Sequence, residues 1–81
     1  MDKENIEERI ERFKILAGLF LKDRISAFIK DIYNTYFFCD INSIEEDKVI
    51  VKCFAPIEKK NKLFPIYWVN ILELKEYKEK N

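Results

Sequence analysis

The chain has 81 residues, with 15 lysines and arginines, 15 aspartates and glutamates, and no histidine. Its length allows one small domain, and a hydrophobic content of 48% excludes a disordered chain. A formal net charge of zero argues against a protein built around strong, sequence-independent phosphate binding, which requires a basic excess. We therefore expect a single folded domain over residues 1–81.

The sequence lacks the side chains on which most catalysis and metal binding depend. Without histidine there is no group that readily moves a proton near neutral pH. The two cysteines, Cys39 and Cys53, are too few for a four-ligand zinc site, and we interpret them as small buried hydrophobes. The paired carboxylates Glu45 and Glu46 fall in a turn, where solvation is their ordinary role. The sequence predicts no enzyme, no metal and no cofactor.

The amino-terminal residues and the apolar runs indicate where the protein resides. Met1-Asp2-Lys3-Glu4 does not resemble a signal peptide, so we expect a reducing, cytoplasmic environment and free thiols. No apolar run approaches the roughly 20 residues that span a membrane. We expect a soluble protein without a membrane partner.

The first segment has the pattern of an amphipathic helix over about residues 5–21. Asn5 is placed to cap it, and Glu8 three residues later completes a capping box. One apolar stripe recurs at steps of three and four residues. It comprises Ile6, Ile10, Phe13, Ala17 and Phe20. Gly18, the only glycine, either begins the end of the helix or allows close backbone contact.

From Arg24 the apolar residues alternate, which is typical of strands with one buried face. Strands are expected over residues 24–30, 36–42, 49–54, 63–68 and 71–74. The turns and the exposed loop are expected at Asp31-Ile32-Tyr33-Asn34, Glu45-Glu46-Asp47 and Glu58-Lys59-Lys60-Asn61-Lys62. Pro65 indicates an edge strand. The tail from residue 76 is expected to fray.

This order of elements predicts an α+β fold. An N-terminal amphipathic helix precedes a five-stranded, strongly bent antiparallel sheet, or a small barrel, over about residues 24–75. Phe37, Cys39 and Ile41 share the core face of the second strand. Phe28, Phe38 and Phe54 have the opposite parity, and we expect them to form a second apolar layer under the helix.

Three stretches resemble the Sm-like (LSm) family of small β-barrels. They are Asp23-Arg24-Ile25-Ser26-Ala27-Phe28-Ile29-Lys30-Asp31, Tyr36-Phe37-Phe38-Cys39-Asp40-Ile41, and Lys48-Val49-Ile50-Val51-Lys52 after an acidic turn. The resemblance implies an SH3-like barrel, ring formation through the fourth and fifth strands, and RNA as a ligand. The family's second-strand glycine and its Arg-Gly pair have no counterpart here, so no RNA-contacting residue is carried over.

The aromatic residues are too numerous for a small barrel to bury, with seven Phe, four Tyr and one Trp. Aromatic rings left at the surface could act as a platform on which bases stack. Tyr33, Tyr36, Tyr67 and Trp68 are the best candidates, because each has a polar edge suited to partial exposure. The basic loop supplies three lysines for phosphate contacts: Lys59, Lys60 and Lys62.

Two functions follow from these features. The first is a non-catalytic module that binds RNA or single-stranded nucleic acid weakly. Its predicted site comprises Tyr36, Lys59, Lys60, Lys62, Tyr67 and Trp68. The alternative is a protein-interaction or assembly module, a homo-oligomer or an accessory subunit, with no role in nucleic-acid binding.

Overall fold

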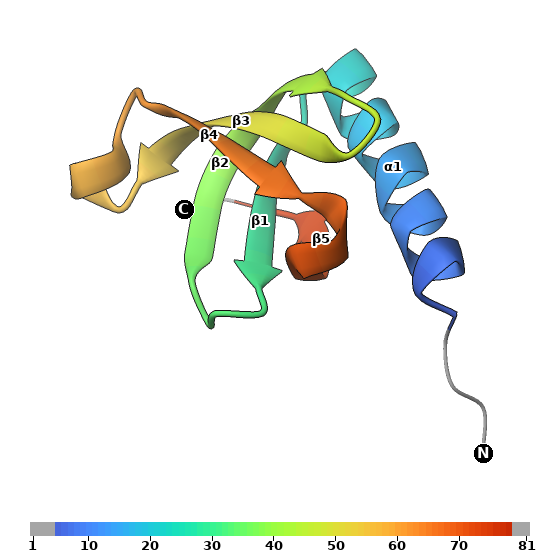
Figure 1. Cartoon of the computed structure of the whole chain (residues 1–81). Coiled ribbons are helices and arrows are strands. Elements are labelled where there is room, and N and C mark those ends of the chain that lie inside the picture. Colours follow the sequence, from blue (N-terminus) through green and yellow to red (C-terminus); the bar gives the residue numbers. More distant parts are fainter. Residues whose placement is uncertain (1–4, 79–81) are drawn as a thin grey trace.

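The computed structural model describes residues 5–78 and shows one helix followed by an antiparallel sheet (Figure 1). The elements are α1 (Ile6–Asp23), β1 (Ser26–Asp31), β2 (Tyr36–Ile44), β3 (Lys48–Ala55), η1 (Ile57–Lys59), β4 (Leu63–Tyr67), η2 (Trp68–Asn70) and β5 (Ile71–Glu76). The strand order is β4-β3-β2-β1-β5. The predicted α+β fold is confirmed, and the sheet is bent but not closed, with β4 and β5 at its two edges.

Local chemistry fixes both ends of α1. The Asn5 side chain accepts a hydrogen bond of 2.7 Å from the Glu7 N–H, as the predicted cap requires. At the other end Arg24 takes a left-handed conformation with φ of 57°, and its N–H bonds back to the last turn. The helix therefore runs through Gly18 and ends at Asp23, two residues beyond the predicted end. Gly18 faces Ile44 of β2 instead of ending the helix.

Two bulges bend the sheet. The pairing of β2 with β3 shifts between Ile41 and Ser43, and again between Phe38 and Cys39. A bulge inserts an extra residue in one strand, which increases its twist and turns it. The strong bend of β2 is thus achieved without any glycine in that strand. Pro65 lies on the edge strand β4, where its missing N–H leaves no gap in the sheet.

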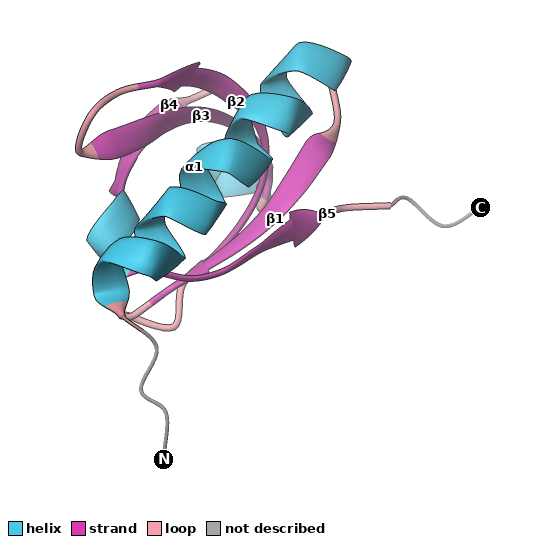
Figure 2. Cartoon of the chain, turned by 90° about the vertical axis from the view of Figure 1, so that its right-hand side faces the viewer, coloured by secondary structure: helices cyan, strands magenta, loops and turns pink. Residues whose placement is uncertain are grey.

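The inner, concave face of the sheet and one side of α1 share a single core (Figure 2). Alternate strand residues enter it because side chains in a strand point to opposite faces in turn. The largest fully buried side chains are Trp68, Ile29, Ile71, Val49, Val51, Cys39 and Cys53. The helix contributes Phe13, Ala17 and Phe20. Of the predicted stripe, Ile6 lies outside this core and is exposed.

The prediction that Phe28, Phe38 and Phe54 form a layer under the helix is wrong. The helix packs on the inner face of the sheet, with Phe37, Cys39 and their neighbours. Because the sheet is open, its concave side leaves an apolar surface that α1 covers. The three phenylalanines consequently lie on the outer face, half-buried.

The carboxyl-terminal segment is more ordered than predicted. Strand β5 continues to Glu76, and the Tyr77 N–H donates to the Ser26 carbonyl at 2.9 Å. The predicted fraying from residue 76 is therefore wrong for residues 76 and 77. Pairing with β1 and contacts of the Tyr77 ring hold this segment. Residues 79–81, for which fraying was also predicted, lie outside the described residues.

Candidate functional site

Five aromatic side chains on the outer face of the sheet contact one another in sequence. We call them the outer aromatic face: Tyr36, Phe28, Phe38, Tyr77 and Phe54. Successive ring centroids along this order are 5.6, 5.4, 5.2 and 5.6 Å apart, and every pair is tilted or edge-on. These are favourable aromatic contacts. The rings join β1, β2, β3 and the residue after β5 into one half-exposed surface.

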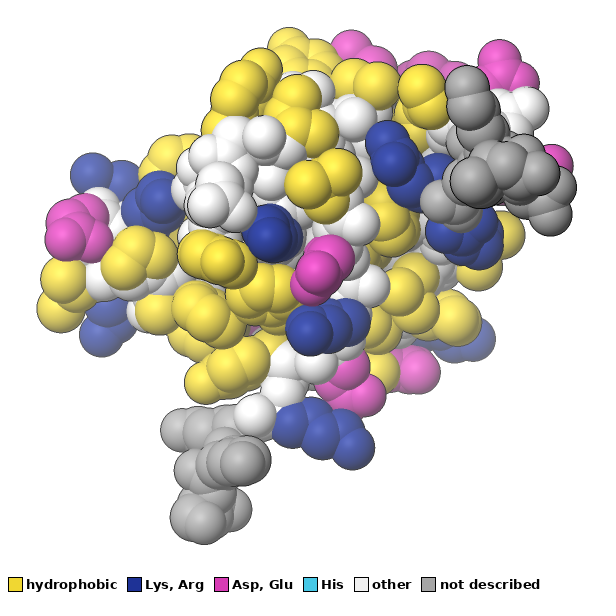
Figure 3. Space-filling view, turned by 90° about the horizontal axis from the view of Figure 1, so that it is seen from below, with side chains coloured by type: hydrophobic (Ala, Val, Ile, Leu, Met, Phe, Trp, Pro, Cys, Tyr) yellow, Lys and Arg dark blue, Asp and Glu magenta, His cyan; other side chains and the backbone are white. Residues whose placement is uncertain are grey.

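Lysine side chains lie over this surface. The Lys75 ammonium is 5.2 Å from the centre of the Phe28 ring, and Lys30 is 5.7 Å from that of Tyr36. Both distances are within the range of cation–π attraction. Figure 3, a view of the molecule from below, shows hydrophobic side chains gathered with basic ones interspersed among them. The outer aromatic face thus combines flat apolar rings with positive charge.

Two open pockets adjoin each other on the outer face and share Ala55. One, of about 350 Å³, is lined by Tyr36, Phe38, Ala55, Pro56 and Lys59. The other, of about 500 Å³, is lined by Ser26, Asp40, Phe54, Ala55 and Tyr77. Pockets of this size with aromatic walls and a few polar groups suit flat ligands.

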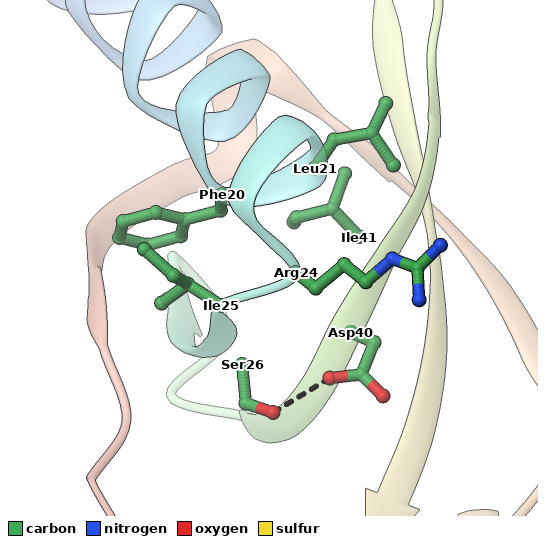
Figure 4. A pocket seen from close by; sticks show the side chains of 7 residues that line it. All are labelled: Phe20, Leu21, Arg24, Ile25, Ser26, Asp40 and Ile41. Atoms are coloured by element: carbon green, nitrogen blue, oxygen red, sulfur yellow. Dashed lines mark hydrogen bonds between the residues drawn. The ribbon is translucent and has the colours of Figure 1, made fainter.

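Asp40 is held in place by its neighbour on β1. The Ser26 hydroxyl donates a 2.6 Å hydrogen bond to one Asp40 carboxylate oxygen, as Figure 4 shows. A further pocket on this side reaches the end of α1, where the Arg24 side chain extends along the same wall (Figure 4). Asp40 therefore borders two pockets and faces solvent from both.

The structure brings two of the predicted site residues together. Tyr36, which is 46% exposed, and Lys59 line one pocket. Lys60 and Lys62 are exposed on the same connection between β3 and β4. This part of the predicted site forms one surface at the end of the sheet where β2 begins.

Tyr67 lies far from this surface. It pairs with Lys48 at the opposite end of β3, six residues from Phe54, which is roughly 20 Å along a strand. Tyr67 is also 46% exposed, and the Lys48 ammonium lies 5.7 Å from its ring centre. Tyr33 is exposed in the turn between β1 and β2. The predicted grouping of Tyr36 with Tyr67 is therefore not observed.

The expected exposure of Trp68 is wrong. Its side chain is 1% exposed, and its indole N–H donates to the Glu45 carbonyl at 3.0 Å. The Trp68 backbone N–H donates to the Asp47 carbonyl, so this residue holds the acidic turn against η2. A buried indole with its one donor satisfied is a structural residue. Trp68 shares strand parity with Ile66, a signal in the sequence that already indicated the inner face.

Sequence reasoning missed most of the outer aromatic face as a site. The sequence pattern predicts Phe28, Phe38 and Phe54 at the helix interface and Tyr77 in a frayed tail. It predicts no binding role for Lys30 or Lys75. Their approach to the aromatic rings depends on the pairing of β1 with β2 and β5, which no local pattern reveals. The alternation of strand residues was the only signal, since it places all three phenylalanines on one face.

The two thiols belong to the core. Cys39 and Cys53 are free, buried and directly opposite each other on β2 and β3. Burial, with smaller contributions from neighbouring Cys53 and Asp40, raises the pKa of the Cys39 thiol far above its ordinary value. Burial also raises the pKa of Cys53, against a lowering by Lys59. Both cysteines therefore stay protonated and unreactive near neutral pH.

Residues 5–78 contain neither a cluster of potential metal ligands nor a helix that could span a membrane. No three side chains of histidine, cysteine, aspartate or glutamate are grouped so as to hold a metal ion. No helix in this range is long and apolar enough to cross a membrane.

A second apolar surface lies on α1, along the side of the helix that borders β5. An open pocket there is lined by Arg12, Phe13, Ile15, Leu16, Leu19 and Leu74. Ile15 is 61% exposed and Leu19 is 49% exposed. Exposed apolar side chains in a row on one helix are characteristic of surfaces that bind other proteins.

Comparison with known proteins adds no family to this description. No protein-family model matches the chain, and no similar curated protein or solved structure was found. The resemblance to Sm-like proteins stays a prediction.

Proposed function

We propose that the protein is a non-catalytic module that binds single-stranded nucleic acid, RNA or DNA, through its outer aromatic face. The observation that carries the proposal is the unbroken series of five aromatic rings, joined by four contacts, with lysines over it. Every base has a flat face, so stacking on such rings contributes about 1–3 kcal/mol per base regardless of sequence. The resemblance of the chain to Sm-like proteins agrees with this proposal.

The positions of the lysines support a backbone contact beside the bases. Lys59 borders the pocket that contains Tyr36, while Lys30 and Lys75 lie over the rings. The three lysines thus place positive charge at and beside the aromatic residues, where it is available for contacts with the phosphates of a bound strand. Since the chain as a whole is neutral, the affinity is modest and falls steeply with added salt.

The test compares two matched double variants by fluorescence anisotropy of a labelled octanucleotide at about 50 mM salt. Tyr36→Ala with Lys59→Ala removes one ring of the outer aromatic face and the lysine that borders the same pocket. Tyr67→Ala with Lys48→Ala removes the same residue types from the far end of the sheet. We expect about tenfold weaker binding for the first pair and less than a twofold change for the second. Equal losses in both, or no binding by the unaltered protein, would refute the proposal.

The apolar pocket on α1 favours a second function, binding of a protein partner. Ile15 and Leu19 expose apolar surface to water, and a helix of a partner protein would cover that surface. The unpaired edge strands β4 and β5 offer a second mode of binding, in which a strand of the partner extends the sheet. Light scattering after size-exclusion chromatography tests self-association. A dimer that dissociates on Leu19→Glu supports this function, and a monomer at every concentration excludes a homo-oligomer.

A further inference from the structure

The pocket lined by Ser26, Asp40, Phe54, Ala55 and Tyr77 contains a carboxylate on a face that otherwise offers rings and lysines. A carboxylate repels phosphate. On a surface that binds nucleic acid, it can therefore contact the ligand favourably only through groups that donate hydrogen bonds to it. The donors of a nucleic acid are the N–H groups of its base edges and the sugar hydroxyls. Asp40 is therefore placed to read a base.

The Asp40 side chain is oriented before any ligand arrives. The Ser26 hydroxyl donates to one carboxylate oxygen at 2.6 Å, and within residues 5–78 no ion pair engages the other oxygen. Lys52 lies directly opposite Asp40 in the pairing of β2 with β3, on the same face. A base contacting Asp40 thus has a cation beside it for its own phosphate.

The two aromatic walls of the pocket determine the orientation of a base that stacks on them. The Phe54 and Tyr77 ring centroids are 5.6 Å apart and the rings are tilted by 52°, so they form two sides of an open angle. A base stacked on either ring presents its edge to the polar side of the pocket, where Ser26 and Asp40 lie. The edge that meets the carboxylate then decides which base is preferred.

Guanine has the matching edge. Its N1–H and N2 amino group are two adjacent donors, and a carboxylate accepts both at once. Adenine and cytosine each present one donor beside an acceptor, while uracil flanks its one donor with two carbonyl oxygens. These acceptors repel a carboxylate. We infer that Asp40, oriented by Ser26, makes this pocket prefer guanine; the inference rests on the proposed binding of single strands by the outer aromatic face.

The experiment measures anisotropy for labelled uridine octamers that carry guanine, inosine or adenine at one central position. Inosine keeps N1–H and lacks the N2 amino group. We expect the guanine octamer to bind about tenfold more tightly than the adenine octamer, with inosine between them. In Asp40→Ala the three affinities should agree within about twofold, and Ser26→Ala should retain part of the preference. The matched control Asp47→Ala removes an exposed carboxylate from a distant turn and should leave the preference intact.

The outcomes separate this inference from the function on which it rests. Tight binding of all three octamers without a preference overturns the guanine inference and leaves the proposed function standing. The guanine inference is also overturned, and the proposed function left standing, if Asp47→Ala abolishes the preference as fully as Asp40→Ala does. The preference would then depend on the net charge of the protein and not on the position of Asp40. If the unaltered protein binds none of the octamers, both are overturned.

Discussion

The inner and outer faces of the same sheet differ in composition, burial and accessibility. Inward residues such as Ile29, Val49 and Val51 are fully buried and mostly aliphatic or β-branched. Outward residues such as Phe28 and Phe38 are aromatic, half-exposed and accompanied by lysines. In an antiparallel sheet with one solvated face, the outward positions are ordinarily polar. The difference teaches that hydrophobic residues serve two ends in this sheet: on one face they close the core, and on the other they present aromatic rings at the surface, where we propose that a ligand binds.

The largest difference between the two faces is expected when a large side chain is removed from the inner face. Trp68→Ala creates a cavity in the core and removes the indole N–H that donates to the Glu45 carbonyl in the acidic turn. We therefore expect a loss of about 3–5 kcal/mol in the free energy of unfolding. Urea unfolding followed by circular dichroism measures it. Trp68→Phe restores most of the volume without the hydrogen bond and should cost less. A loss in Trp68→Ala below about 1 kcal/mol would contradict the assigned role.

On the outer face, Phe38→Ala should separate stability from binding. Its ring contacts Phe28 and Tyr77 but is half-exposed, so its removal should cost only about 1–2 kcal/mol of stability. Binding of a labelled octamer should weaken by about tenfold, because the central ring of the outer aromatic face is lost. The two effects are read from urea unfolding and anisotropy. Unchanged binding by a folded variant would show that the outer face is not the ligand surface.

Alkaline pH should destabilise the inner face through its thiols. Cys39 has a raised pKa in the folded protein, so above its ordinary value of 9.0 the unfolded chain loses a proton that the folded chain keeps. Rising pH then favours unfolding by up to about 1.4 kcal/mol per pH unit for this group. Below that value both states are protonated and the contribution is absent. Urea unfolding from about pH 8 to pH 10 should therefore show a steeper decline in the unaltered protein than in Cys39→Ala. Parallel declines would count against this assignment.

The smallest effect is expected at the exposed end of the outer face. Lys48 bonds to Glu45 at 3.2 Å and to Asp47 at 3.4 Å, and these acidic partners raise its pKa. Because both carboxylates are exposed and the Lys48 side chain is only partly buried, Lys48→Ala should lower the melting temperature less than any change above. That difference should vanish at about 1 M salt, where charges are screened within about 3 Å. A large loss that persists in salt would indicate a packing role for the lysine stem.

Local patterns predicted the elements but not how they meet. The Asn5 cap, the strand alternation and the edge position of Pro65 all depend on a few neighbouring residues, and each is confirmed. The helix stripe shows only that α1 must pack on something, and this sheet offers two apolar faces. The position of Lys75 over Phe28 depends on the pairing of β5 with β1, which places these two residues opposite each other although they are 47 positions apart in the sequence. Contacts between strands that are distant in the sequence depend on the whole fold, so local sequence patterns could not predict them.

The place of Tyr77 has a practical consequence for anyone handling the protein. Its ring forms part of the outer aromatic face, and only four residues of the sequence follow it. A purification tag, fluorophore or fusion partner joined after Asn81 is therefore tethered within a few residues of the rings to which we propose that nucleic acid binds. The start of α1 lies well away from the end of β5 (Figure 2). Labels for binding measurements and surface immobilisation should be attached there.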